Sequence, residues 1–207
     1  MALTHIGGNV DILGVDVSLT SLGWFLQDGK PSLTYGSFKT TPKDGLLIER
    51  FMLQRDRFEE LVSRNGITHI GIEQPLEHIY NSELLFALHQ FIFEVCYKKK
   101  INVVYITPAQ IKQYVTGNHL AQKNEIIIKT REVLGFKREK INDDECDAFW
   151  VSLLTKRFWG LYYKELTEDT LTEAERFIFI KTKSKKLGIL KKPNISFYIF
   201  NKEIPCH

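Results

Sequence analysis

Short apolar runs, and apolar residues that alternate with polar ones, recur through the first half of the chain. Both patterns are typical of strands, because successive side chains of a strand point to opposite faces of a sheet. Asp28-Gly29 interrupts one alternating stretch and predicts a hairpin, since both residues tolerate a positive φ. The pattern predicts five strands, over residues 11–17, 22–27, 33–39, 67–73 and 101–106.

Between and after these strands, apolar residues recur every three or four positions, as on the buried face of a helix. This spacing predicts helices over residues 46–62, 81–97, 107–117, 122–134, 142–159 and 170–180, and residues 195–200 are compatible with a further strand. Three helices begin with a capping box, which pairs Thr or Asn with Gln or Glu three residues later. The capping boxes are Thr107–Gln110, Asn142–Glu145 and Thr170–Glu173. The order of elements predicts an α/β fold, a mixed sheet with helices on both faces.

The composition excludes several classes of protein. With 207 residues, 43% of them hydrophobic and 26% charged, the chain is neither disordered nor collagen-like and has room for one large domain. Its longest apolar stretch, residues 84–96, is interrupted by His89, Gln90 and Glu94, whereas a membrane span needs about 20 mostly apolar residues. We therefore expect no membrane-spanning segment and no membrane partner.

Two features of the sequence indicate a reducing compartment. The first residues lack the basic region and apolar run of a secretory signal. Cys96, Cys146 and Cys206 are scattered and form no C-x-x-C pair, which argues against a disulfide framework or a structural zinc site. The expected location is therefore the cytoplasm.

Positive charge is concentrated in the last part of the chain. Residues 181–207 hold seven lysines, Lys185 and Lys186 among them, and one acidic residue, Glu203, whereas the first 180 residues have a net charge of −3. A cluster of lysines gains affinity for a polyanion by releasing counterions from phosphate. The alternative is that this stretch only increases solubility.

Carboxylates occur where apolar side chains are expected. Asp16 and Glu73 lie in or at the end of apolar strands, and Asp144 and Asp147 share one face of a predicted helix. A buried carboxylate has to be paired, protonated or bound to a metal ion. The favourable N-terminal end of the helix dipole explains Asp144 but not Asp147, which lies a turn further in.

Four carboxylates without a Cys/His cluster suit a hard cation such as Mg²⁺ or Mn²⁺. Two such ions can activate water and stabilise the leaving oxygen in phosphodiester cleavage. The alternative assigns no metal site. In that case Asp16 caps a turn, Glu73 pairs with a lysine, and the two helical acids are solvated.

The order of these motifs resembles the RuvC family of Holliday-junction resolvases, which has a ribonuclease H-like fold. The first and second motifs are apolar strands that each end in a carboxylate residue. The third motif is a basic segment, and the fourth is an acidic segment at the start of a helix. The segments that carry the resemblance are residues 12–16 (with Ser18 and Gly23), 70–74, 110–123 and 143–148.

This resemblance implies a role for individual residues. Asp16, Glu73, Asp144 and Asp147 would form the metal-binding catalytic set. Lys112 and Lys123 match positions of basic residues near the DNA, and Leu76 stands where cellular members have a phenylalanine that separates strands at the junction. Lys185 and Lys186, in the Lys-rich stretch, are further expected DNA contacts.

The implied protein is a Mg²⁺-dependent endonuclease, with Mn²⁺ as a substitute, that resolves Holliday junctions and other branched DNA by paired nicks. Because two symmetric strands have to be cut, a two-fold homodimer is expected, with residues 82–97 as its candidate interface. Residues 1–163 would form the nuclease domain, with a five-stranded ribonuclease H-like sheet, and residues 164–207 a helical and Lys-rich extension. Compact, divergent members of this kind resemble phage-encoded resolvases.

Three other functions fit parts of the pattern. A protein that kept the fold and its basic surface could bind branched DNA without cutting it. Another ribonuclease H-like nuclease, acting on RNA–DNA hybrids or on DNA ends, would use the same carboxylates. A sugar-kinase-like ATPase shares the first-strand aspartate, but the sequence lacks a second Gly-rich phosphate loop.

Overall fold

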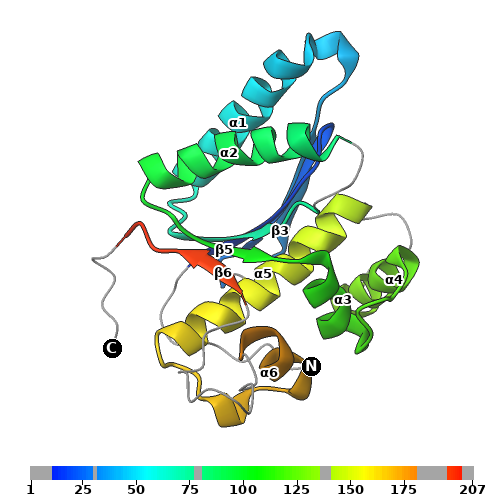
Figure 1. Ribbon diagram of the computed structural model, residues 1–207, viewed down its shortest axis with the longest axis vertical. Helices are drawn as coiled ribbons and strands as arrows, with labels where there is room; N and C mark the ends of the chain where they lie inside the picture. Colours follow the sequence, from blue (N-terminus) through cyan, green and yellow to red (C-terminus); the bar gives the residue numbers. More distant parts are fainter. Residues whose placement is uncertain (1–10, 30–31, 77–80, 136–140, 181–194, 202–207) are drawn as a thin grey trace.

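A six-stranded mixed sheet forms the centre of the protein, as seen in the computed structural model, which describes residues 11–29, 32–76, 81–135, 141–180 and 195–201 (Figure 1). The strand order is β3-β2-β1-β4-β5-β6. The strands are β1 (Ile12–Val17), β2 (Ser21–Gln27), β3 (Thr34–Lys39), β4 (His69–Glu73), β5 (Asn102–Ile106) and β6 (Ser196–Tyr198). β1, β2 and β3 pair antiparallel, β4 is parallel to both β1 and β5, and β6 is antiparallel to β5.

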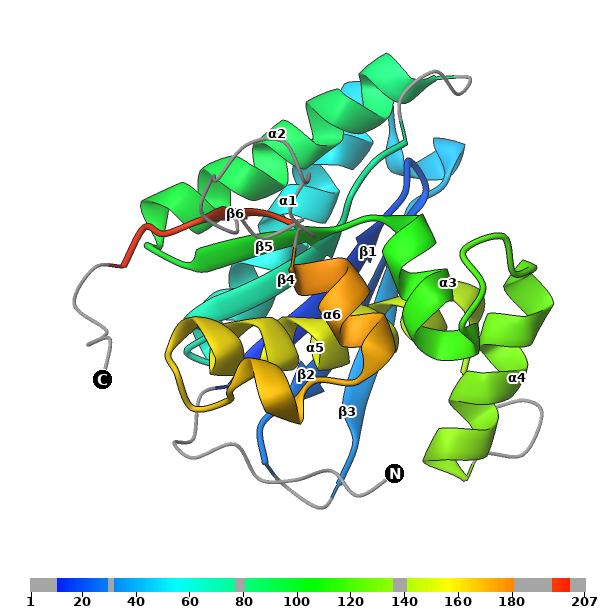
Figure 2. The same ribbon diagram turned by 60° about the horizontal axis from the view of Figure 1, so that its bottom comes forward.

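Helices cover both faces of the sheet (Figure 1). The helices are α1 (Leu47–Arg64), α2 (Ser82–Lys98), α3 (Pro108–Thr116), α4 (Lys123–Leu134), α5 (Asp143–Tyr162) and α6 (Glu173–Phe179), with short 3₁₀ turns η1 (Pro42–Asp44) and η2 (Glu168–Thr170). α1 and α2 lie on one face, and α5 crosses the other together with α3, α4 and α6 (Figure 2). This mixed sheet with helices on both faces confirms the predicted α/β fold.

Among the described helices none is long and apolar enough to cross a bilayer.

Two details of the prediction are wrong. The sheet has six described strands rather than five, because Ser196–Tyr198, within the stretch 195–200 that is compatible with a strand, pairs with the free edge of β5. The predicted capping box Thr170–Glu173 does not form, since the Thr170 hydroxyl donates instead to the Thr167 carbonyl at 2.7 Å. The last helix begins after Thr172, whose hydroxyl accepts a hydrogen bond from the backbone N–H of Glu175.

The core has two halves, one on each face of the sheet. One half lies under α1 and α2 and includes Phe58 and Ile92, and the other lies under α5. Trp150, Phe158 and Trp159 of α5 belong to this second half and are at most 4% exposed. The long helix α5 is thus apolar on most sides, because the sheet and three helices surround it.

Glycines on three neighbouring strands let α5 approach the sheet closely. Gly14 of β1 is paired with Gly71 of β4, and Gly23 of β2 is paired with Asp16. A Cβ atom at Gly14 would fall on the backbone of α5, and one at Gly71 would fall on the Thr155 hydroxyl. These glycines therefore determine how deeply α5, and every side chain it carries, sits on the sheet.

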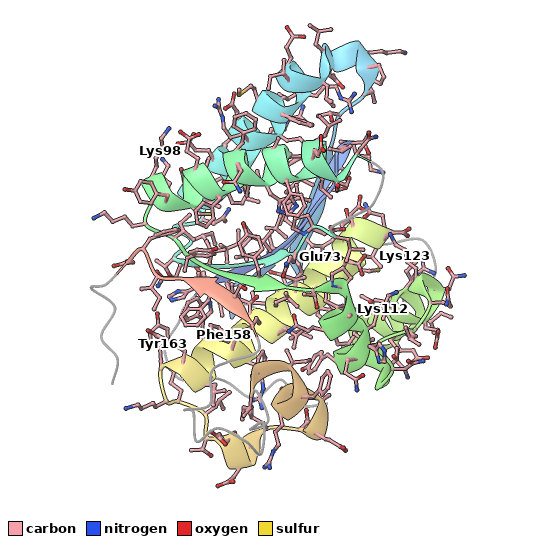
Figure 3. All side chains as sticks on the ribbon, in the orientation of Figure 1. Glu73, Lys98, Lys112, Lys123, Phe158 and Tyr163 are labelled. Carbon is pink, nitrogen blue, oxygen red and sulfur yellow. The ribbon has the colours of Figure 1, made fainter. Side chains whose placement is uncertain are left out.

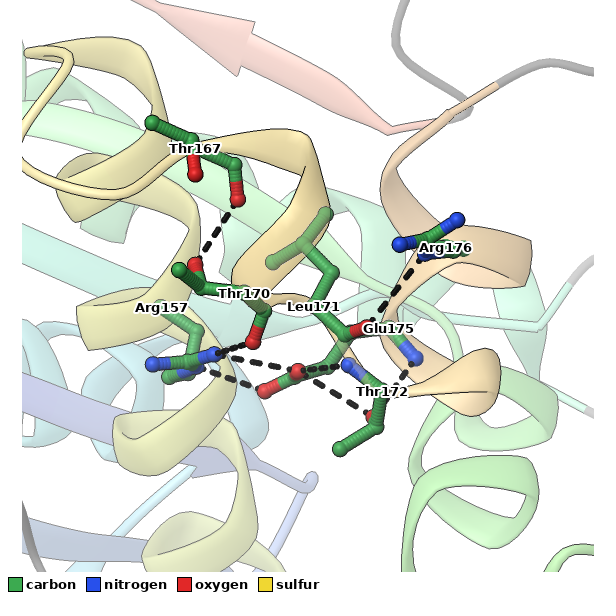
Figure 4. A network of polar contacts seen from close by, with 7 residues as sticks. All are labelled: Arg157, Thr167, Thr170, Leu171, Thr172, Glu175 and Arg176. Carbon is green, nitrogen blue, oxygen red and sulfur yellow. Dashed lines mark hydrogen bonds and ion pairs between the residues drawn. The ribbon is translucent and has the colours of Figure 1, made fainter.

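A buried ion pair joins α6 to α5 (Figure 4). The Nε of Arg157 donates to Oε1 of Glu175 at 2.6 Å, and Nη2 donates to Oε2 at 3.1 Å, while the Thr172 N–H donates to Oε2 at 2.8 Å. Burial favours the neutral acid, but these hydrogen bonds hold the pKa of Glu175 below its ordinary value. Ile178 and Phe179 of α6 are buried in the same core half as α5, so the chain is packed onto the core as far as residue 180.

Candidate functional site

Asp16 and Glu73 lie side by side at one end of the sheet. Asp16 is the last but one residue of β1, and Glu73 is the last residue of β4. The parallel register pairs Val15 with Ile72, and a carboxylate residue follows each of these directly. Parallel strands present their carboxyl ends at one edge, so the two acids meet there although 57 positions separate them.

The helix α5 brings a third carboxylate to the same edge. Ligand oxygens of Asp16, Glu73 and Asp147 all lie within 4.8 Å of one another, and all three side chains are half-buried. Asp144 is not in this group, but it is close enough for its charge to raise the pKa of Asp16 and of Glu73. Of the four predicted ligands, the structure thus joins three closely and places the fourth at the margin.

Burial and mutual repulsion make these acids weak. Burial is the main cause that raises the pKa of Asp16 and of Glu73 well above its ordinary value, and repulsion from the neighbouring carboxylates adds to it. The pKa of Asp147 rises to about 6, mainly because of burial, and the charge of Lys123 opposes this rise. Ionising the cluster without a cation is therefore unfavourable.

One oxygen of the cluster lacks any partner. Oε2 of Glu73 is buried and has no hydrogen-bond partner among the described residues. A buried carboxylate oxygen that no donor satisfies costs free energy unless a cation or a water molecule occupies the space beside it. Three converging carboxylates with such an oxygen fit a hard divalent cation, because cations of this kind prefer oxygen ligands.

Two lysines flank the cluster, on the helices that precede α5 (Figure 3). Lys123, at the start of α4, places Nζ 3.4 Å from Oδ2 of Asp143 and 3.9 Å from Oδ2 of Asp147, and about half of its side chain is exposed. Lys112, on α3, is near enough to oppose the rise in the pKa of Asp147. Both predicted DNA-contacting lysines therefore lie at the rim of the acidic cluster.

A hydrogen-bond network holds the N-terminus of α5 against β3. Asn142 and Glu145 form the predicted capping box, in which Oδ1 of Asn142 accepts from the N–H of Glu145 and Oε2 of Glu145 accepts from the N–H of Asn142, both at 3.0 Å. The Ser37 hydroxyl donates to Oε1 of Glu145 at 3.2 Å and accepts from Nδ2 of Asn142 at 3.0 Å. Ser37 thus positions the turn that carries Asp144.

Sequence reasoning missed this support. The capping box identifies Glu145, but nothing in the sequence of β3 links Ser37 to a helix more than 100 residues away. In the sequence Gly23 belongs only to the first motif, whereas its role depends on packing. The backbone and Cβ of Asp144 occupy the space that a side chain at Gly23 would need.

The remaining predicted residues lie near this edge or outside the described residues. Leu76, three positions after Glu73, is 50% exposed. Lys185 and Lys186 lie outside the described residues.

A mixed sheet covered on both faces, with acidic side chains at the ends of its central parallel strands, defines an α/β protein of the ribonuclease H-like class. The family model "Crossover junction endodeoxyribonuclease RuvC" matches residues 12–155. This range covers more than two thirds of the sequence and includes the acidic cluster and both flanking lysines. The chain belongs to the RuvC family.

Individual relatives agree with this assignment. The crossover junction endodeoxyribonuclease RuvC of Orientia tsutsugamushi (strain Boryong) is 27% identical over 143 residues, which is 66% of this chain and 89% of the relative. The protein of that name from Thermomicrobium roseum is 30% identical over 142 residues, which is 66% of this chain and 86% of the relative.

Solved structures confirm the fold. Thermus thermophilus RuvC superimposes with a TM-score of 0.57 at 22% identity, over 70% of this chain and 92% of that one. The same protein in complex with a Holliday junction substrate gives a TM-score of 0.58 at 21% identity, over 70% of this chain and 90% of that one. The matched family range ends before α6 and β6 begin.

Proposed function

We propose that this protein is an endonuclease that resolves Holliday junctions and other branched DNA by paired nicks. The observation that carries the proposal is the convergence of Asp16, Glu73 and Asp147 at one edge of the sheet, with Lys123 and Lys112 at the rim. This arrangement suits a phosphodiester, because its negative charge can be bound both by a cation on the carboxylates and by the neighbouring lysine side chains. Curated relatives that bear the name crossover junction endodeoxyribonuclease support the same activity.

The proposed cofactor is Mg²⁺, with Mn²⁺ as a substitute. Asp16, Glu73 and Asp147 would bind the cation, and Asp144, which lies beside them, would be the fourth ligand. When bound, divalent cations in such a site activate a water molecule and stabilise the leaving oxygen of the phosphodiester. The expected products are nicks with a 5′-phosphate and a 3′-hydroxyl.

The lysines would have two tasks. In the metal-free protein Lys123 partly neutralises Asp147 and Asp143, which lowers the repulsion between the cluster and an incoming phosphate. Because its side chain is half exposed, its ammonium can turn to a DNA phosphate once a cation takes over the neutralisation. Lys112 would bind a phosphate of the same strand, and Lys185 and Lys186 would add affinity that does not depend on DNA shape.

A homodimer is part of the proposal, because a junction has two equivalent strands to cut. The candidate interface is α2, whose exposed side includes the apolar residues Leu84 and Tyr97. The opposite side of the helix is buried in the core and is not available to a partner.

The decisive experiment is incubation of the protein with a labelled four-way junction, with Mg²⁺, with Mn²⁺ and with EDTA. We expect two nicked linear duplexes from the junction when either metal is present, and no product in EDTA or with the Asp16→Asn variant. Binding without a product under all conditions would indicate a non-cleaving junction-binding protein. Shortened ends, or preferential cutting of an RNA–DNA hybrid, would indicate another nuclease activity.

A further inference from the structure

A cavity of about 280 Å³ lies on the other side of the sheet edge that carries the acidic cluster. Its floor is formed by Gln74 and Pro75, which follow β4 directly, and by Tyr105 of β5. Ser196 and Tyr198 of β6 form one wall. This volume is close to the lower end of the range for small-molecule sites, about 300 Å³, which suits one flat ring system rather than a folded peptide.

The other wall comes from four residues of α2 at helical spacing. Phe86, His89, Gln90 and Phe93 recur every three or four positions and so face the same space. His89 is 2% exposed, and neither of its ring nitrogens reaches a hydrogen-bond partner among the described residues. The ring lies near the backbone of Val17, the residue after Asp16, but outside hydrogen-bond geometry.

The aromatic rings leave room for a planar group. The rings of Phe93 and Tyr198 meet edge to face, with centroids 4.9 Å apart, and those of Tyr105 and Tyr198 meet edge to face at 6.2 Å. The His89 ring is tilted by 35° to Tyr105 at 6.4 Å. Tyr198 is stacked on Phe200, with centroids 6.2 Å apart, so the faces of Phe93 and Tyr105 that neighbouring rings leave open are the ones that can stack on a ligand.

The lining has donors and acceptors but no permanent charge. The polar groups are the amides of Gln74 and Gln90, the Ser196 hydroxyl, the two tyrosine hydroxyls and the imidazole of His89. Burial lowers the pKa of His89 to about 4, so the imidazole is neutral at pH 7 and has one donor and one acceptor nitrogen. A phosphate or a metal ion would find no opposite charge here, whereas a nucleobase would find aromatic faces and hydrogen-bonding groups.

We propose that this cavity receives one unpaired nucleobase of the bound DNA, from a nucleotide next to the phosphate that is cut. The inference rests on the proposed function, because the acidic cluster defines where that phosphate lies. Gln74, which lines the cavity, directly follows Glu73, so the cavity lies beside the same end of β4, within reach of a nucleotide next to one held at Glu73. Branched DNA supplies such a base cheaply, since stacking is already interrupted at the crossover.

This site is a feature of this chain. One wall is β6, which lies beyond the residues that the RuvC family model matches. The sixth strand therefore does more than cover the edge of β5, because it closes a space that would otherwise be an open groove beside α2.

The experiment that tests the inference is photo-crosslinking. Four-way junctions would carry 5-iodo-deoxyuridine at one position at a time, within three nucleotides of the mapped nick, and would be irradiated in EDTA with the wild-type protein. We expect one position to crosslink to Tyr105, Tyr198 or Phe93, identified by mass spectrometry, and a linear duplex of the same sequence to give at least tenfold less. Crosslinks elsewhere only, or equal crosslinking from the duplex, would overturn the inference.

Variants provide a second readout. Ser196→Trp fills the cavity, and we expect it to remove the crosslink and slow junction cleavage at least tenfold, whereas Ser63→Trp, on an exposed site of α1, changes neither. Gln90 occupies an exposed position of α2, and Gln90→Leu removes one amide from the lining, so a preparation with the oligomeric state of wild type should differ in which base at the crosslinked position is cut fastest. An unchanged crosslink in Ser196→Trp together with an unchanged preference in Gln90→Leu would refute the site.

The outcome separates this inference from the proposed function. A wild-type protein that cuts the junction in Mg²⁺ but gives no crosslink in the cavity loses only the nucleobase site. A protein that cuts no junction loses the proposed function, whatever the crosslinks show. Equal crosslinking by free 5-iodo-deoxyuridine monophosphate would show that the cavity takes free nucleotides, which also contradicts delivery by the DNA strand.

Discussion

The substitution Gly23→Ala tests how the sheet positions the catalytic edge. A Cβ atom at this position would lie 2.5 Å from both the carbonyl carbon and the carbonyl oxygen of Asp144, and 2.7 Å from its Cβ. Ordinary contacts begin near 3.4 Å, so α5 or β2 has to move by about 0.9 Å. The obstacle is largely backbone, and a rotamer change cannot relieve it.

Two consequences of different size follow. Overpacking of this kind costs about 1–3 kcal/mol in the free energy of unfolding. The first turn of α5 is tied to β3 through Ser37 and Glu145, so the strain moves the turn as a unit and displaces Asp144 and Asp147 together. A displacement near 1 Å in a catalytic constellation costs roughly 100-fold in rate. We therefore expect a folded but much slower enzyme.

The assay pairs urea unfolding with the rate of junction cleavage in saturating Mn²⁺. Gly36→Ala is the matched control, since it lies on the neighbouring strand β3 and the three atoms nearest to its Cβ would all belong to the side chain of Trp24, at 3.0–3.3 Å. The control should keep its cleavage rate and lose less stability than Gly23→Ala. A Gly23→Ala protein that unfolds within 0.5 kcal/mol of wild type and cuts at the wild-type rate would refute the packing argument.

Four further outcomes are expected. Because burial and repulsion raise the pKa of Asp147 to about 6, the metal-free protein should lose stability as pH rises from about 4 through 6, and urea titrations should show a smaller loss for Asp147→Asn. Mn²⁺ should raise the melting temperature of wild type but not of Asp16→Asn, which should still bind junctions in a gel-shift assay; an equal rise in both would exclude Asp16 as a ligand. Arg157→Met leaves the buried Glu175 carboxylate unpaired and should cost about 3 kcal/mol in chemical unfolding, and a neutral result would show that the pair adds nothing. Replacing the six lysines of residues 181–192 by Gln, which leaves β6 in place, should flatten the dependence of DNA affinity on salt by roughly 0.9 per lost phosphate contact, and an unchanged slope would assign these lysines to solubility alone.

The local pattern of the sequence predicted most of the elements. The hairpin at Asp28-Gly29, the crossover helices and the capping boxes of α3 and α5 lie where periodicity and cap residues placed them, because these signals act within a few residues. Asp16 and Glu73 were recognisable for the same reason, since a charged residue in an apolar strand stands out against its immediate neighbours. Their common location followed from the parallel order of β1 and β4.

Features that depend on distant parts of the chain were decided only by the tertiary structure. The pairing of β6 with β5 and the link from Ser37 to α5 join segments that are far apart in the chain, and the sequence of neither segment indicates the contact. Asp147 lies inside the cluster and Asp144 beside it. This difference arises from the depth and rotation of α5 against the glycines of β1, β2 and β4. Backbone contacts between the helix and three strands determine that depth, and periodicity cannot encode it.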